Sequence, residues 1–161
     1  MPVLDERLFK SPSVALQQAK NAVVKMSRRA ARNVNLAAPL LLKMDEDTVS
    51  AINVRENLID RMEVAISNYL IKMTDQELGD DESHAVTELL NFVTEFERIG
   101  DYAVNIMEKA EELNEKEASF SENAQRELHL LEQALEHILT LTNDAFENED
   151  MRKAAQVEPL E

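Results

Sequence analysis

Residues 95–105 read EFERIGDYAVN, a stretch of helix-forming residues interrupted by three that a buried helix face rarely holds: Glu97, Gly100 and Asp101. Apolar residues recur around them at intervals of three and four, which is typical of one face of an α-helix. Glycine inside a helix costs about 1 kcal/mol relative to alanine, and a carboxylate on a buried face needs a partner. We therefore expect a helix that makes a close contact or room for an ion at this point.

The composition of the whole chain indicates an all-α fold. The 161 residues include only two glycines and four prolines, and 4% are aromatic. The long stretches rich in Ala, Leu, Glu, Lys, Gln and Met favour helices, and no alternation of apolar and polar residues predicts a strand. The 44% apolar content fits a folded domain in spite of the net charge of -15.

Capping residues, prolines and polar loops divide the chain into four long helices and the start of a fifth. The first is expected to begin at Ser11 and Pro12, and the fourth at a capping box formed by Ser119 and Glu122. The expected ranges are 11 to the region of 33–43, from the acids at 45–47 to about 73, about 81–113, 119–144, and 151 onward.

The short loops between the first three helices favour long antiparallel helices packed as a three-helix bundle, which we assign to residues 1–116. Residues 117–161 would then form the first helix and a stub of a second, incomplete bundle. The apolar stripe of the fourth helix has few partners within the chain, which favours a homo-oligomer. The residues expected in this stripe are Leu128, Leu131, Leu135 and Ile138.

A second acid pair precedes the first on the neighbouring helix. Glu56 and Asp60 in ENLID, like Glu97 and Asp101, are four residues apart and therefore share a helix face. Two such pairs on antiparallel helices could converge as four acids, which repel one another unless a cation neutralises them. Oxygen ligands suit hard cations such as Mg, Mn, Ca or ferric iron. With 32 acids in the chain, chance pairing on solvated faces is the alternative interpretation.

Several function classes are disfavoured. The chain has no cysteine, glycine-rich phosphate loop, GxSxG or HExxH motif, so we do not expect an enzyme. A small metal-dependent hydrolase, which would need a positioned base, is kept as an alternative. The acidic character of residues 44–161, where nine Lys and Arg face thirty acids, argues against nucleic acid as a partner. We expect neither a membrane span nor an export signal.

ERIGDYAVNI, residues 97–106, resembles the signature helix of the PhoU family, and ENLID resembles the other ExxxD element of that family. The segment LDERLFKSPSVALQQAKNAVVKM, residues 4–26, resembles the junction leading into the soluble C-terminal PhoU-like domain of bacterial sodium/phosphate cotransporters. This resemblance implies two tandem three-helix bundles, of which the chain would hold the first and about half of the second. Glu161 would then be the first acid of a further ExxxD motif.

The resemblance also implies a function. The family regulates phosphate transport and homeostasis by acting on transporters and signalling proteins, at the cytoplasmic side of the membrane. The resemblance implies multinuclear metal clusters, which contain iron or zinc in some relatives and are bound through ExxxD motifs. These motifs are carried over here to Glu56, Asp60, Glu97 and Asp101; Mg and Mn also fit oxygen ligands. The junction implies covalent continuation from a transporter membrane domain. A metal-free helical scaffold or self-association module is the main alternative.

Basic residues concentrate near the start of the chain, where residues 1–43 hold eight Lys and Arg against two acids. Four of them have the spacing of a single helix face: Lys25, Arg28, Arg29 and Arg32. In a domain held beneath a membrane, this basic stripe would face anionic lipid headgroups or a partner. The alternative is a solvated face that pairs with the acidic helices of the same bundle.

Overall fold

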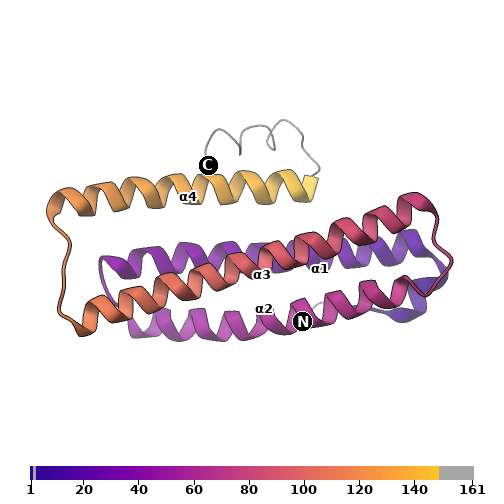
Figure 1. Ribbon diagram of the computed structural model, residues 1–161, viewed down its shortest axis with the longest axis horizontal. Coiled ribbons are helices and arrows are strands. Elements are labelled where there is room, and N and C mark those ends of the chain that lie inside the picture. The colour runs from indigo at the N-terminus through magenta and orange to yellow at the C-terminus, as the bar shows by residue number, and fades with distance from the viewer. Residues whose placement is uncertain (2, 149–161) are drawn as a thin grey trace.

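The computed structural model describes residues 1 and 3–148, and this part of the chain is all-α with no strand (Figure 1). The elements are η1 (Glu6–Lys10), α1 (Pro12–Ala37), η2 (Ala38–Leu41), α2 (Glu46–Met73), α3 (Asp80–Glu115) and α4 (Glu122–Asn148). The expected all-α fold and the four long helices are confirmed. The fifth helix expected from Met151, and the acid Glu161, lie outside the described residues.

The first three helices form a bundle in which consecutive helices run in opposite directions (Figure 1). Helix α1 contacts both α2 and α3 through a face made mostly of small residues. Because alanine side chains are short, the neighbouring helices can approach this face closely. The fully or almost fully buried alanines of α1 are Ala15, Ala19, Ala22, Ala30 and Ala37.

Helix α3 presents an uninterrupted seam to the bundle, because its buried residues alternate at intervals of three and four. They are Val86, Leu89, Val93, Phe96, Gly100, Ala103, Met107 and Ala110. Helix α2 has a matching seam that contains Ile52, Ile59 and Ile66, all fully buried. Glu56 occupies the position in this seam between Ile52 and Ile59, so the fold places a carboxylate where a core residue would stand.

The N-termini of two helices differ from expectation in their caps. The Ser11 side chain makes no capping hydrogen bond, although Pro12 occupies the first helical turn as expected. Helix α4 is capped by Ser121, whose Oγ accepts the backbone N–H of Ala124 at 3.1 Å. The predicted cap at Ser119 is therefore wrong, because the helix begins at Glu122 and only Ser121 immediately precedes it.

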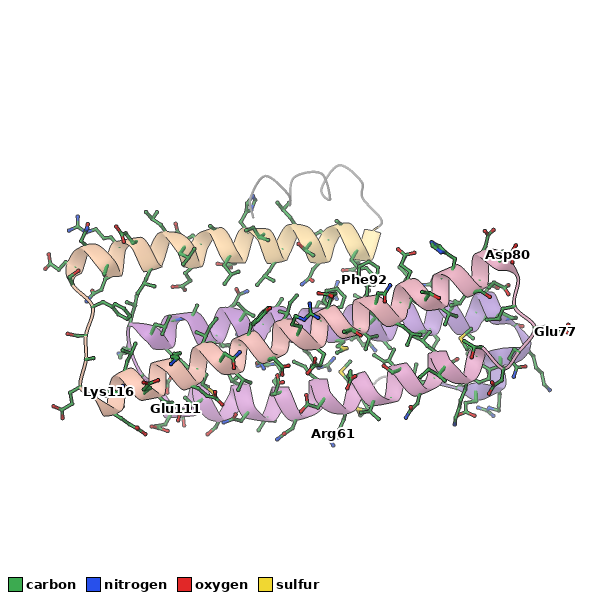
Figure 2. All side chains as sticks on the ribbon, in the orientation of Figure 1. Arg61, Glu77, Asp80, Phe92, Glu111 and Lys116 are labelled. Atoms are coloured by element: carbon green, nitrogen blue, oxygen red, sulfur yellow. The ribbon has the colours of Figure 1, made fainter. Side chains whose placement is uncertain are left out.

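Helix α4 packs on the bundle through its C-terminal half. Phe146 packs against two rings of α3, with its ring centroid 4.6 Å from that of Phe92 and 5.5 Å from that of Phe96. Figure 2 shows Phe92 on the side of α3 that faces α4. Leu131 was expected to point inward, but 65% of it is exposed. The other three residues of that stripe, Leu128, Leu135 and Ile138, are half-buried. The division of the chain at residues 116 and 117 stays a prediction.

Candidate metal centre

The four predicted acids lie together at the middle of the α2–α3 interface. Glu56 and Asp60 come from α2, and Glu97 and Asp101 from α3. Because these helices are antiparallel, the first acid of each motif lies near the second acid of the other. Glu56 and Glu97 are half-buried, whereas Asp60 and Asp101 are exposed. The site therefore has an inner pair of carboxylates and an outer pair that borders solvent.

Gly100 provides the space that the inner carboxylate occupies. A Cβ atom at Gly100 would lie 3.0 Å from Oε2 of Glu56 and 3.6 Å from Cγ2 of Ile59. The first distance is shorter than ordinary van der Waals contact. The Glu56 side chain packed against Gly100 thus explains why a glycine stands in the interior of this helix.

The buried oxygen of Glu56 has no hydrogen-bond partner among the residues that the structure describes. Its Oε2 atom is inaccessible to solvent, and no donor among the described residues reaches it. Burial raises the pKa of Glu56 from 4.5 to about 7, and the neighbouring carboxylates of Asp60 and Asp101 add to this rise. A carboxylate in this position is unfavourable unless it is protonated or neutralised by a cation.

Glu97 is affected in the same way from the other helix. The pKa of Glu97 is raised to about 7, chiefly by burial. A hydrogen bond with the Asp101 carboxyl and repulsion from Asp101, Glu63 and Asp60 also contribute to this rise. Glu63 was not among the predicted ligands. The sequence pattern that could have identified Glu63 is its position on the same helix face as Glu56, four residues after Ile59. With Glu63, the acidic cluster of this site has five members.

No base in the described part of the chain pairs with these five acids. Among residues 1 and 3–148, no lysine, arginine or histidine forms an ion pair with Glu56, Asp60, Glu63, Glu97 or Asp101. In the same part of the chain, no three acidic or histidine side chains already stand in a metal-coordinating arrangement. The side chains would therefore have to rearrange to coordinate a cation.

The residues fit a bound cation. An orphaned, buried carboxylate oxygen faces a space that a single Cβ would fill, and every side chain of the cluster offers oxygen ligands, as hard cations prefer. The exposed side chains of Asp60 and Asp101 can rotate without disturbing the core. Glu56 and Glu97 would hold the inner side of a cation and these two aspartates the outer side.

The basic stripe does not present one uniform surface. Arg28 forms an ion pair with Glu147 of α4, and Lys25 and Arg28 line an open groove between the two helices. Arg29 donates from Nη1 to the carbonyl oxygen of Lys25 at 3.4 Å and, with Arg32, approaches α2 instead. One member of the stripe, Arg28, is therefore in an ion pair, as the solvated-face interpretation expects, whereas the other three form none within the described part of the chain.

No helix in the described part of the chain has the length and apolarity needed to cross a membrane.

Comparisons with known proteins place this site within a family. The profile of the PhoU domain matches residues 23–110, which include both acid pairs. A phosphate-specific transport system accessory protein PhoU homologue of Clostridium acetobutylicum is 25% identical over 113 residues, which make up 69% of this chain and 50% of that relative. The chain thus spans about half the length of this relative. No solved structure shows significant similarity to the chain. The chain belongs to the PhoU domain family.

Proposed function

We propose that the chain is a non-catalytic regulatory domain of phosphate transport and homeostasis, which binds metal cations and acts by protein interaction. The proposed ligands are Glu56, Asp60, Glu97 and Asp101. Family membership supports the regulatory role, and the relative from Clostridium acetobutylicum carries the name of a transport accessory protein. When bound, the cation would supply the positive charge that this acidic cluster lacks.

The observation that carries the metal proposal is the unpartnered Oε2 atom of Glu56. Buried polar atoms are rarely left without a partner, and this one belongs to a group of five acids that form no ion pair with a base among the described residues. Protonation would satisfy it in part, but a multivalent cation would relieve the repulsion of the whole cluster. Mg, Mn and ferric iron are candidates because all of the ligands are carboxylate oxygens. Zinc, which also accepts carboxylate oxygens, is a candidate through the resemblance to the family.

Elemental analysis of the purified protein tests this proposal. We expect about one metal ion or more per chain in the wild type, and a loss of most of it in the double variant Glu97→Ala, Asp101→Ala. The matched control is Glu88→Ala, Glu95→Ala, which removes two exposed acids from the same helix and should retain the metal.

Two results would contradict the proposal. One is a wild type that stays metal-free after incubation with ferric iron, manganese or zinc. The other is metal binding that the double variant retains in full. Either result would favour the metal-free scaffold, in which Gly100 and the acids have only a structural role.

The finer features of this function are also proposals. The segment of residues 4–26, which resembles the junction of sodium/phosphate cotransporters, supports a place next to a transporter membrane domain and a location at the cytoplasmic face of the membrane. In that setting the partners would be phosphate transporters or phosphate-signalling proteins. The absence of the main catalytic motifs from the sequence supports a role in binding.

We further propose that the chain forms a homo-oligomer through the N-terminal half of α4. Leu130 and Leu131 are 64% and 65% exposed, and Leu130 lines an open groove with Leu42. Light scattering after gel filtration should give more than one chain per particle for the wild type and a monomer for Leu130→Glu, Leu131→Glu. Changing the exposed Val54 and Val64 of α2 to Glu is the control, and a monomeric wild type would contradict the proposal.

A further inference from the structure

Three arginines gather on the side of the bundle formed by α1 and α2. Arg29 and Arg32 belong to α1, and Arg55 belongs to α2. Arg55 is directed to α1, whereas the adjacent Glu56 is directed to Gly100 of α3. The arginine cluster and the acidic cluster therefore lie on different sides of α2, and no residue belongs to both.

A buried asparagine fixes the position of Arg55. Asn33 is fully buried in α1, and its Nδ2 donates to the carbonyl oxygen of Ile52 at 3.1 Å. Its Oδ1 accepts a hydrogen bond from Nη1 of Arg55 at 3.4 Å. Asn33 thus bridges the two helices and holds one side of the Arg55 guanidinium, while the remaining donors of that guanidinium have no acceptor among the described residues.

The cluster has no counterion in the described part of the chain. None of the three arginines forms an ion pair there, although acids outnumber basic residues by 32 to 17 in the sequence. Burial lowers the pKa of Arg55, and the charges of Arg32 and Arg29 lower it further. Three like charges held together without an acid carry a free-energy cost that a bound anion would remove.

We propose that Arg29, Arg32 and Arg55 form a binding site for a phosphate-type oxyanion. Guanidinium groups present several N–H donors in a fixed plane, which matches the oxygens of a phosphoryl group, and charge-assisted hydrogen bonds of this kind are strong. Arg55 is held in place by Asn33 before the anion arrives, and the two arginines of α1 complete the site from the solvent side.

Two kinds of ligand carry a phosphoryl group of this type. Inorganic phosphate would make the cluster a sensor of the free anion, and the phosphomonoester of a lipid headgroup would make it a membrane contact. The proposal does not rest on the carboxylate site, because it needs neither a metal ion nor any of the acids there.

Calorimetric titration of the metal-free protein with inorganic phosphate at constant ionic strength is the first arm of the test. The metal-free protein is used so that phosphate cannot bind through a cation. We expect binding that weakens by about tenfold or more in Arg29→Gln, Arg32→Gln, because two of three charge-assisted partners are lost. The control Arg7→Gln, Arg61→Gln removes the same charge elsewhere, and Arg61 points away from the bundle (Figure 2).

Sedimentation with vesicles is the second arm, comparing phosphatidylcholine alone with phosphatidylcholine that contains phosphatidic acid. Binding of free phosphate that depends on Arg29 and Arg32 supports the site and assigns the free anion. Binding only to the phosphatidic acid vesicles, with the same dependence, supports the site and assigns the lipid headgroup. The proposal is overturned if neither probe binds, or if binding persists in the double variant and is lost in the control. Should the double variant not fold, Arg32→Gln alone gives the same comparison at an exposed position.

Discussion

Without metal, replacing Glu56 by Gln should stabilise the protein at about pH 8. The carboxyl group of Glu56 is buried beside Asp60 and Asp101, and its pKa rises from 4.5 to about 7. In a fully buried group, such a rise in pKa would correspond to a cost of about 3 kcal/mol in the free energy of unfolding. Because the residue is only partly buried and solvent screens its charge, we expect a gain of about 1–2 kcal/mol in the free energy of unfolding. Glutamine keeps the size of the side chain and removes the charge.

The pH dependence of the metal-free wild type follows from the same cause. Between about pH 4.5 and 7 the folded chain holds protons on Glu56 and Glu97 that the unfolded chain has released. The free energy of unfolding should therefore fall as the pH rises through this range, and the full cost should be present above about pH 7. Below about pH 4.5 both states are protonated, and the two groups contribute no difference.

Urea unfolding in the presence of a chelator, at intervals from about pH 5 to pH 8, measures both effects. Glu56→Gln, Glu97→Gln should have a flatter profile than the wild type, and Glu88→Gln, at an exposed position on α3, should follow the wild type. A wild type whose stability rises across this range, or a Glu56→Gln variant less stable than the wild type at about pH 8, would contradict the assignment.

Addition of a metal cation that binds the site should make the wild type more stable than the Glu56→Gln variant. A metal ion favours the ionised form of Glu56 and stabilises the folded state by mass action. Glutamine is a weaker ligand, so the variant should gain less stability from the metal than the wild type does. The same substitution therefore separates the electrostatic cost of the acidic cluster from its contribution to metal binding.

The sequence predicted the helices well because helix formation follows local patterns. Intervals of three and four between apolar residues, together with prolines and polar loops, determine most of the boundaries of α1 to α4. The acid pairs were predicted to converge because their spacing places each pair on one helix face, and the contact between Glu56 and Gly100 agrees with this expectation. The role of Gly100 in making room was inferred from the propensity of glycine alone.

The features that sequence reasoning missed depend on contacts between helices. Periodicity placed Leu131 on the apolar face of its helix but did not show that Leu131 is exposed while Leu128, Leu135 and Ile138 are half-buried. The basic stripe was read from α1 alone, so the sequence did not reveal that Arg28 pairs with α4 or that Arg55 of α2 joins Arg29. Nor did it show that Asn33 of α1 would bridge to α2 through a buried amide. Each of these contacts joins residues 19 or more positions apart.

Substitutions of Gly100 should have effects that depend strongly on size. Leucine would bring a whole side chain into the space that now holds the Glu56 carboxylate, so Gly100→Leu should lower the free energy of unfolding by about 2–3 kcal/mol and abolish metal binding. Alanine adds only a Cβ, 3.0 Å from Oε2 of Glu56. Its gain in helix propensity, about 1 kcal/mol, should be largely offset by the displacement of that carboxylate, which leaves Gly100→Ala close to the wild type.

A double-mutant cycle isolates the contact between the two residues. Once Glu56→Ala has removed the carboxylate, Gly100→Ala should show its full gain of about 1 kcal/mol, so the two substitutions should couple by about that amount. Gly79→Ala is the matched control, because no atom lies within 4 Å of a Cβ at that position, and its coupling with Glu56→Ala should be zero. Additive effects of Gly100→Ala and Glu56→Ala would mean that the glycine does not hold space for this carboxylate. The presence of Gly100 beside the five acids would then need another structural explanation.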